Sequence, residues 1–268
     1  MVAALPPHPR LRAWWRRGCD FLGVDAAIMG GAMTWVSERN LVAAVSEAGA
    51  FGVIACGAMT PDLLRDEIRA TRALTGRPFG VNLIVMHPKL DELAEVCIAE
   101  KLGHVVLAGG LPPRGVVPRL KEGGAKVLCF APSLAVVPAA EGKAGRKDGA
   151  RGGADALIIE GAEAGGHIGP VSTSVLAQEI LPHLKEVPVF VAGGIGSGEA
   201  IAAYLRMGAA GVQIGTLFVC AEESIAHPRF KQAFVRAGAR DAVPSVQIDP
   251  AFKVIPVRAL ANAATQRF

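Results

Sequence analysis

The sequence has few of the residues that crosslink a chain or bind a metal ion. Its five cysteines lie far apart among 268 residues, and none belongs to a C-x-x-C pair. An odd number of cysteines at such spacing argues against a disulfide framework and against a zinc knuckle. Histidines in an H-x-x-x-H arrangement and clusters of carboxylates are also missing. We therefore expect reduced cysteines and no metal site.

Long apolar runs and a strong charge of either sign are missing as well. Charged residues or glycines interrupt every apolar stretch before the roughly 18 residues that a membrane-spanning helix needs. The N-terminal arginines are not followed by the apolar region of a secretory signal. The net charge of +4 is too small and scattered for a nucleic-acid-binding surface, although it mildly favours phosphate-bearing ligands. We expect a soluble, cytoplasmic protein without a membrane or nucleic-acid partner.

The sequence does contain a regular series of apolar segments. Apolar residues make up 51% of the chain and charged residues 19%, which suits one globular domain over residues 1–268. Eight apolar runs of strand length begin near residues 26, 51, 79, 104, 125, 154, 187 and 210, with helical patterns between them. Runs of Val, Ile and Ala without polar alternation are typical of strands buried on both faces. The series predicts an α/β fold, a (β/α)8 TIM barrel.

The segments between the apolar runs carry helix signals, with one exception. Thr60 and Pro61 are typical of a helix start, and Gly76 is typical of the end of the same helix. After the fifth run, residues 136–153 contain a proline and five glycines. Each interior glycine costs a helix about 1 kcal/mol, and a proline costs more. The fifth helix is therefore expected to be missing or disordered.

Glycine-rich segments follow the seventh and eighth predicted strands. The seventh ends in AGGIGSG (192–198), directly before a predicted helix, and the eighth ends in QIGT (213–216). In TIM barrels phosphate commonly binds at these two strand ends, through bare amides and a helix N-terminus. The alternative, that a glycine only makes a tight turn, stays open at any single position. A Rossmann site is excluded, because Gly194, Gly196 and Gly198 do not fit G-x-G-x-x-G.

The sixth predicted strand runs into EGAEAGGHIG (160–169), beside the predicted phosphate site. A planar cofactor across the barrel mouth needs backbone without side chains on one side, and Gly165 and Gly166 supply it. His167 follows these glycines and is a candidate for binding substrate or moving a proton, because histidine titrates near neutral pH. The alternative for His167 is a loop histidine whose ring is satisfied by backbone groups.

Two polar side chains end otherwise apolar strands. Asn82 ends the third run, where a buried amide needs hydrogen-bond partners. A flavin's ring edge or ribityl chain would provide them, and so would the backbone of a neighbouring loop. Glu160 ends the sixth run and could accept hydrogen bonds from ribityl hydroxyls, whereas Glu163 is expected to be solvated.

In these segments the chain resembles the nitronate monooxygenase family and its close relatives, the FMN-dependent enoyl-acyl-carrier-protein reductases. The resemblance covers nearly the whole chain, and EAGGH, AGGI and QIGT in this order are its most specific part. Further matching segments are GGAMTWV (30–36), AVSEAGAFGVI (44–54), PFGVNLI (78–84) and ESIAHPRFK (223–231). The resemblance implies a TIM barrel with FMN bound across its mouth.

The resemblance also implies a role for each candidate residue. Backbone from the first loop would meet the flavin ring, two polar side chains would hydrogen-bond the cofactor, and glycines would admit the ring and hold the phosphate. The implied cofactor-binding residues are, in that order, Ala32 and Met33; Asn82 and Glu160; Gly165 and Gly166; and Gly194 with Gln213, Ile214, Gly215 and Thr216. His167 corresponds to the active-site histidine of the family.

Three functions follow from the resemblance. The first is an FMN-dependent oxidoreductase that oxidises alkyl nitronates with dioxygen, with His167 orienting the substrate or deprotonating a nitroalkane. The first alternative is an NAD(P)H-dependent FMN enoyl-acyl-carrier-protein reductase, and the second is a barrel that binds flavin without catalysis. The expected partners are a small-molecule substrate, either a nitronate or an enoyl thioester, and a second copy of the chain.

The chain departs from the family pattern in three places. Residues 136–153 replace a helix, and Leu217 stands where relatives usually have arginine. The family's C-terminal extension, which helps to cover the active site, is expected to be lacking after Phe268. These departures are the reason for keeping the non-catalytic alternative.

Overall fold

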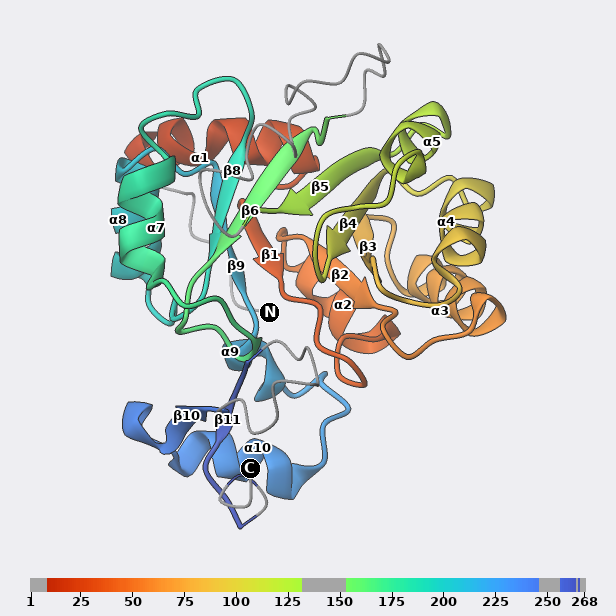
Figure 1. Ribbon diagram of the computed structural model, residues 1–268. Helices are drawn as coiled ribbons and strands as arrows, with labels where there is room; N and C mark the ends of the chain where they lie inside the picture. The colour runs from red at the N-terminus through yellow and green to blue at the C-terminus, as the bar shows by residue number, and fades with distance from the viewer. Residues whose placement is uncertain (1–8, 132–152, 246–255, 264, 266–268) are drawn as a thin grey trace.

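Eight parallel strands form the centre of the molecule, and helices lie around them (Figure 1). The structure, a computed structural model, describes residues 9–131, 153–245, 256–263 and 265. The strands are β1 (Ile28–Gly30), β2 (Gly52–Ala55), β3 (Phe79–Ile84), β4 (His104–Ala108), β5 (Lys126–Phe130), β6 (Ala156–Glu160), β8 (Val189–Ala192) and β9 (Gly211–Ile214). Each lies in one of the eight apolar runs, so the TIM-barrel prediction is confirmed.

The sheet curls until its two end strands meet. Its order is β1-β9-β8-β6-β5-β4-β3-β2. Met29 of β1 forms an isolated parallel bridge with Phe51, just before β2. The N–H of Gly30 donates to the carbonyl of Phe51 at 2.8 Å, and the N–H of Phe51 donates to the carbonyl of Ile28 at 2.9 Å. The barrel is therefore nearly closed, and alternate residues of each strand point into it.

Two apolar clusters fill the inside and the outside of the barrel. The inner cluster includes Met29, Phe51, Leu128 and Phe190, all of which are fully or almost fully buried. The outer cluster joins the opposite faces of the strands to the surrounding helices, and Leu83 belongs to it. Because side chains alternate along a strand, Asn82, which precedes Leu83 in β3, points into the barrel. By the same alternation Glu160, the last residue of β6, also points inward.

The helices begin and end where the sequence signals lie. Thr60 accepts a hydrogen bond through its hydroxyl oxygen from the N–H of Leu63 at 3.3 Å, and α3 follows with Pro61 as its first residue. Gly208, with φ +106°, follows the C-cap residue of α8 and marks the end of that helix. The barrel helices are α2 (Arg39–Glu47), α3 (Pro61–Leu74), α4 (Leu90–Ala99), α5 (Val116–Glu122), α7 (Thr173–Ile180) and α8 (Gly198–Arg206), and α1 (Pro9–Leu22) precedes the barrel.

The C-terminal residues form a small second sheet, which the sequence analysis did not predict. In Figure 1 they lie below the barrel, joined to it through α9 (Thr216–Val219). The sheet has the order β10-β11-β7, all antiparallel. Its strands are β10 (Ala242–Pro244), β11 (Val257–Leu260) and β7 (Gly166–His167). Two helices, α10 (Pro228–Arg236) and the short η2 (Ala239–Asp241), precede β10 in the chain.

Two expectations about the whole chain meet the limits of the described residues. The helix that was expected to be missing after β5 falls on residues 136–153. Apart from Gly153, these lie outside the part of the chain that the structure describes. In the described part, no helix has both the length and the apolar character that crossing a bilayer requires.

Candidate functional site

The carboxyl ends of β1 and β9 meet at one side of the barrel mouth. The N–H of Gly31 donates to the carbonyl of Ile214 at 2.8 Å. A Cβ atom added at Gly31 would lie 3.3 Å from the Cα atom of Gly215, and one added at Gly215 would lie 3.8 Å from the sulfur of Met33. The predicted residues of the first loop and of the QIGT segment are therefore neighbours.

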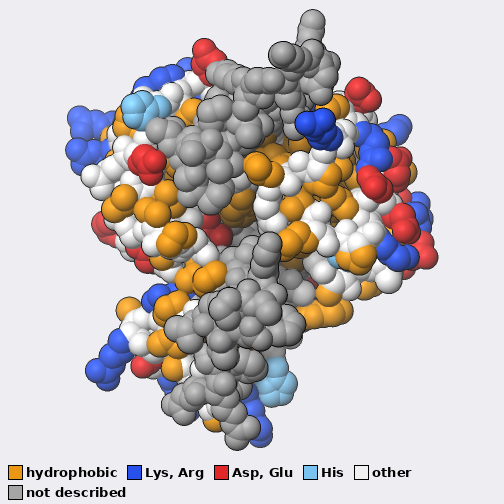
Figure 2. Space-filling view, in the orientation of Figure 1, with side chains coloured by type: hydrophobic (Ala, Val, Ile, Leu, Met, Phe, Trp, Pro, Cys, Tyr) orange, Lys and Arg blue, Asp and Glu red, His pale blue; other side chains and the backbone are white. Residues whose placement is uncertain are grey.

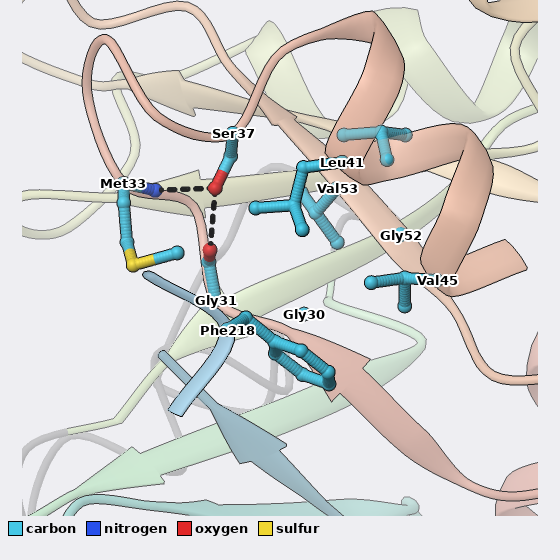
Figure 3. Close-up of a pocket in the computed structure, with 10 residues that line it drawn as sticks. Gly30, Gly31, Met33, Ser37, Leu41, Val45, Gly52, Val53 and Phe218 are labelled. Carbon is cyan, nitrogen blue, oxygen red and sulfur yellow. Dashed lines mark hydrogen bonds between the residues drawn. The ribbon is translucent and has the colours of Figure 1, made fainter. Parts of the chain in front are cut away.

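Ser37 fixes the loop that follows β1 (Figure 3). Its hydroxyl donates to the carbonyl of Gly31 at 2.9 Å and accepts from the N–H of Met33 at 3.0 Å. The carbonyl of Met33 accepts from the N–H groups of Val36 and Ser37. Both backbone polar groups of Met33 are thus used within the loop, so Met33 meets the mouth with its thioether side chain. The cavity beneath the loop has a volume of about 10 Å³, room for about one water.

Asn82 and Glu160 occupy inward positions at the ends of β3 and β6. The carbonyl of Asn82 accepts hydrogen bonds from Cys56, but its side-chain amide, in a residue only 5% exposed, has no partner among the described residues. The Glu160 carboxyl also makes no hydrogen bond or ion pair within the described part of the chain. Burial raises the pKa of Glu160 to about 7. Two polar groups that need partners therefore face the barrel mouth.

The glycines after β8 have two different reasons for being glycine. Gly193 and Gly194 have φ values of +101° and +70°, a region that side chains other than glycine rarely adopt. A Cβ atom added at Gly196 or Gly198 would meet nothing within 4 Å. The hydroxyl of Ser197 caps α8 by accepting from the N–H of Ala200 at 3.2 Å. The turn needs the first two glycines, while the next two leave open space beside the start of α8.

The EGAEAGGHIG segment also contains glycines of two kinds. A Cβ atom added at Gly161 would lie 2.1 Å from the hydroxyl oxygen of Thr173, so this glycine is required by packing. One added at Gly165 would lie 3.3 Å from the hydroxyl of Thr216, which brings this segment to the end of β9. Gly166 has φ +84°, and a Cβ atom there would meet nothing within 4 Å.

His167 lies outside the barrel wall, in β7, and is exposed. It pairs with Val257 of β11, and Gly166 pairs with Arg258. The N–H of the following residue, Ile168, donates to the carbonyl of Pro256 at 2.9 Å. The C-terminal segment therefore holds the histidine in place through backbone hydrogen bonds.

The predicted site residues thus fall into two groups. The larger group lies at the neighbouring ends of β1, β6, β8 and β9, in the strands themselves or in the loops that follow them: Ala32, Met33, Glu160, Gly165, Gly166, Gly194 and the four residues Gln213 to Thr216. Asn82 stands apart, because β3 is separated from β9 by β2 and β1 on one side and from β6 by β4 and β5 on the other. A ligand touching both groups must span the mouth. Within the described residues, no three His, Cys, Asp or Glu side chains are grouped to hold a metal ion.

Glu163 is exposed, as the sequence analysis expected, but it also makes contacts that sequence reasoning missed. Its carboxylate accepts from the N–H of Thr173 at 2.8 Å and from the hydroxyl of Thr173 at 2.9 Å. Burial by itself raises the pKa of Glu163, but these hydrogen bonds and the nearby positive charge of Arg258 outweigh burial and lower the pKa. No local pattern indicates this contact, because its partners lie ten residues apart in two loops.

Known proteins are similar to this chain both in sequence and in fold. The family model described as nitronate monooxygenase matches residues 17–106 and 91–268. The chain is 35% identical over 234 residues to (3aS,4S,5R,7aS)-5-hydroxy-7a-methyl-1-oxo-octahydro-1H-indene-4-carboxyl-CoA dehydrogenase of Mycobacterium tuberculosis, covering 86% of this chain and 62% of that protein. It is 31% identical over 270 residues to the nitronate monooxygenase of Paraburkholderia phytofirmans, covering 82% and 70%.

Solved structures agree in fold. FabK from Thermotoga maritima has a TM-score of 0.85 and 40% identity, with 94% of this chain and 76% of that chain covered. The nitroalkane oxidase of Streptomyces ansochromogenes has a TM-score of 0.79 and 29% identity, with 94% and 80% covered. The chain spans only 62% of the length of the Mycobacterium tuberculosis dehydrogenase.

Proposed function

Since the chain belongs to the nitronate monooxygenase family, we propose that it is an FMN-dependent oxidoreductase whose cofactor lies across the carboxyl-terminal mouth of the barrel. The observation that carries the proposal is a pair of polar side chains, the buried Asn82 and the half-buried Glu160, that face the mouth from two strands and have no hydrogen-bond partner among the described residues. A ligand with hydrogen-bonding groups along its length would satisfy both of them. The glycine-rich ends of β8 and β9 would take its phosphate.

The residues of the mouth fit FMN part by part. Glu160, as a carboxylate, would accept hydrogen bonds from ribityl hydroxyls, and the amide of Asn82 would bind the polar edge of the ring. Phosphate would meet Gly194 and the backbone of residues 213–216, where open space lies beside the start of α8. The ring would rest against the side-chain-free surface of Gly165 and Gly166 and against Ala32 and Met33.

Substrate would approach from the side of His167. FMN supplies the electron transfer, while the chain supplies binding, orientation and proton handling. For a nitronate substrate, the His167 ring would orient the anionic nitro group or remove the α-proton of a neutral nitroalkane. The exposed position of His167 in β7 gives substrate direct access to its ring nitrogens. Dioxygen is the second substrate in this proposal.

A second candidate is reduction of an enoyl thioester with NAD(P)H as the electron donor. Two comparisons favour it. The Mycobacterium tuberculosis relative has a carboxyl-CoA compound in its name, and CoA compounds of this kind are thioesters. Identity to FabK, at 40%, exceeds identity to the nitroalkane oxidase, at 29%. In this candidate His167 would orient the thioester or donate a proton to it.

The absorption spectrum of the purified chain, followed by anaerobic additions, tests these candidates. Bound flavin gives a yellow protein, and bleaching by an alkyl nitronate alone supports nitronate oxidation. Bleaching by NADH or NADPH, with reoxidation by an enoyl thioester, supports the second candidate. Retained flavin that neither donor reduces leaves a flavin-binding barrel without catalysis. A colourless protein that does not bind added FMN contradicts the proposal as a whole.

A further inference from the structure

Glu163 connects the histidine segment to the start of α7. Its carboxylate accepts two hydrogen bonds from one residue, Thr173, from the N–H at 2.8 Å and from the hydroxyl at 2.9 Å. Thr173 is the first residue of α7, so its N–H has no partner within the helix. A carboxylate at this end of a helix is also favoured by the helix dipole. Glu163 therefore anchors the segment between β6 and β7 to a helix that is fixed in the core.

Thr173 is itself packed against the backbone of the glycine-rich loops that follow β6 and β8. It is 2% exposed, and its hydroxyl oxygen lies 3.1 Å from the carbonyl of Gly193 and 3.3 Å from that of Ala192. A hydroxyl has a single hydrogen, and a charged acceptor forms the stronger bond, so the Glu163 carboxylate decides where it points. A Cβ atom added at Gly161 or Gly193 would collide with Thr173.

Glu163 also touches the turn that follows β8. A Cβ atom added at Gly194 would lie 2.9 Å from the Cβ atom of Glu163, so the side chain passes directly over this glycine. Arg258 of β11, which is paired with Gly166, is close enough for its charge to act on the carboxylate. The Glu163 side chain thus contacts the turn at Gly194 and the start of α7, and it lies near β11, the strand that pairs with His167.

We propose that Glu163 is a positioning residue that, through Thr173, sets the Gly165–His167 segment and the Gly193–Gly194 turn in one fixed relation. The inference rests on the proposed function, because it assigns Glu163 to the geometry of the cofactor site. Glu163 itself is not assigned a contact with FMN. Without the carboxylate, the two loops keep their sequences but lose the shared anchor, and FMN then has to order them on binding.

The test compares FMN dissociation constants and thermal stability for matched variants of the full chain. We expect Glu163→Gln to weaken FMN binding about tenfold, because the amide oxygen can still accept from Thr173 but without the charge that strengthens these hydrogen bonds. Thr173→Val should weaken it by a similar factor, and the double variant should be no weaker than either one, because both substitutions remove the same link. Thr173→Ser keeps the hydroxyl and should bind FMN like the wild type.

Glu179→Gln is the control, since it removes an exposed carboxylate from α7 itself. Additive losses in the double variant, or a Glu163→Gln variant whose FMN affinity equals that of Glu179→Gln, would overturn the inference. If Thr173→Val does not fold, the comparison of Glu163→Gln with Glu179→Gln still decides. Failure of the wild type to bind FMN would instead remove the proposed function, so the two failures are distinct.

Discussion

The two halves of the barrel mouth are built from different residues. The loops after β1, β3 and β4 expose large apolar side chains, with Trp35 67%, Met86 65% and Leu111 57% exposed. The loops after β6 and β8 instead expose glycines and polar side chains, among them His167, and Leu217 after β9 is the exception at 58% exposed. Figure 2 shows hydrophobic side chains towards the middle of the face and charged ones over the outer helices.

Under the proposed function, the two halves would bind different parts of the ligands. The glycine-rich half is held by hydrogen bonds and by close packing, so it offers fixed backbone groups to a phosphate or a hydroxyl. The apolar half offers surface without polar groups, which suits a ring or an alkyl chain. Four predictions test the contrast, in order of decreasing expected effect.

Packing should make the glycine-rich half far less tolerant of an added methyl group. In Gly161→Ala the new Cβ atom would lie 2.1 Å from the Thr173 hydroxyl and 2.2 Å from its nitrogen, so we expect a loss of about 3 kcal/mol or more in unfolding free energy. The control is Gly57→Ala in the apolar half, whose Cβ atom would be 3.3 Å from Ile84 and should cost less than about 1 kcal/mol. Denaturant unfolding measures both, and equal losses would contradict the contrast.

His167 should affect turnover without affecting cofactor affinity. We expect His167→Ala to reduce kcat/KM about a hundredfold, the usual contribution of a group that moves or orients a proton. Its FMN dissociation constant should stay unchanged, because the segment is held by backbone bonds to β11. Steady-state kinetics with nitronate or NADH and a flavin titration measure the two quantities. Unchanged kinetics would remove His167 from the mechanism.

Glu160 should make the flavin-free protein less stable as pH rises. Its folded-state pKa of about 7 lies above the ordinary 4.5, so its stabilising contribution is complete below about pH 4.5 and is lost as pH rises through 7. We expect Glu160→Gln to be more stable than the wild type at pH 8 by about 2 kcal/mol, and the difference to vanish at pH 4. Denaturant unfolding at both pH values measures this. FMN binding by the variant should be weaker, and a variant that is both less stable and tighter binding would contradict the assignment.

Trp35 should be replaceable with a small gain in stability. Its φ of +65° is unfavourable for a bulky residue, and its side chain is exposed, so Trp35→Asn should stabilise the fold by about 0.5 to 1 kcal/mol. If the apolar half binds substrate, KM should rise at the same time. Lys101→Asn is the matched control, because Lys101 has φ +51° and lies after α4, away from the mouth. It should gain stability with unchanged KM, and a Trp35→Asn variant that behaves identically would remove Trp35 from substrate binding.

The sequence predicted those parts of the molecule that depend on neighbouring residues. Strands buried on both faces read as apolar runs, and helix starts such as Thr60 carry their own capping group. The positive φ values of Gly193 and Gly194 agree with the turns that their sequence indicates. The convergence of these turns with the QIGT segment followed from the TIM-barrel rule about strand ends.

The remaining features depend on contacts between distant segments. The pairing of His167 with Val257 joins residues far apart in the sequence, and two-residue strands have no periodicity to detect. The hydrogen bonds of the exposed Glu163 were not predicted, because only the fold brings its carboxylate to Thr173. The sequence analysis gave no role to Gly161, and the structure explains it by the packing of Thr173.

The place of β11 in the chain sets the order in which the protein can mature during synthesis. The ribosome delivers all eight barrel strands before it delivers residues 257–260, so the barrel can close while β7 still has no partner. A nascent or nicked chain that stops short of Val257 would therefore contain every residue that we propose to bind the cofactor, yet its His167 would lack the backbone support of β11.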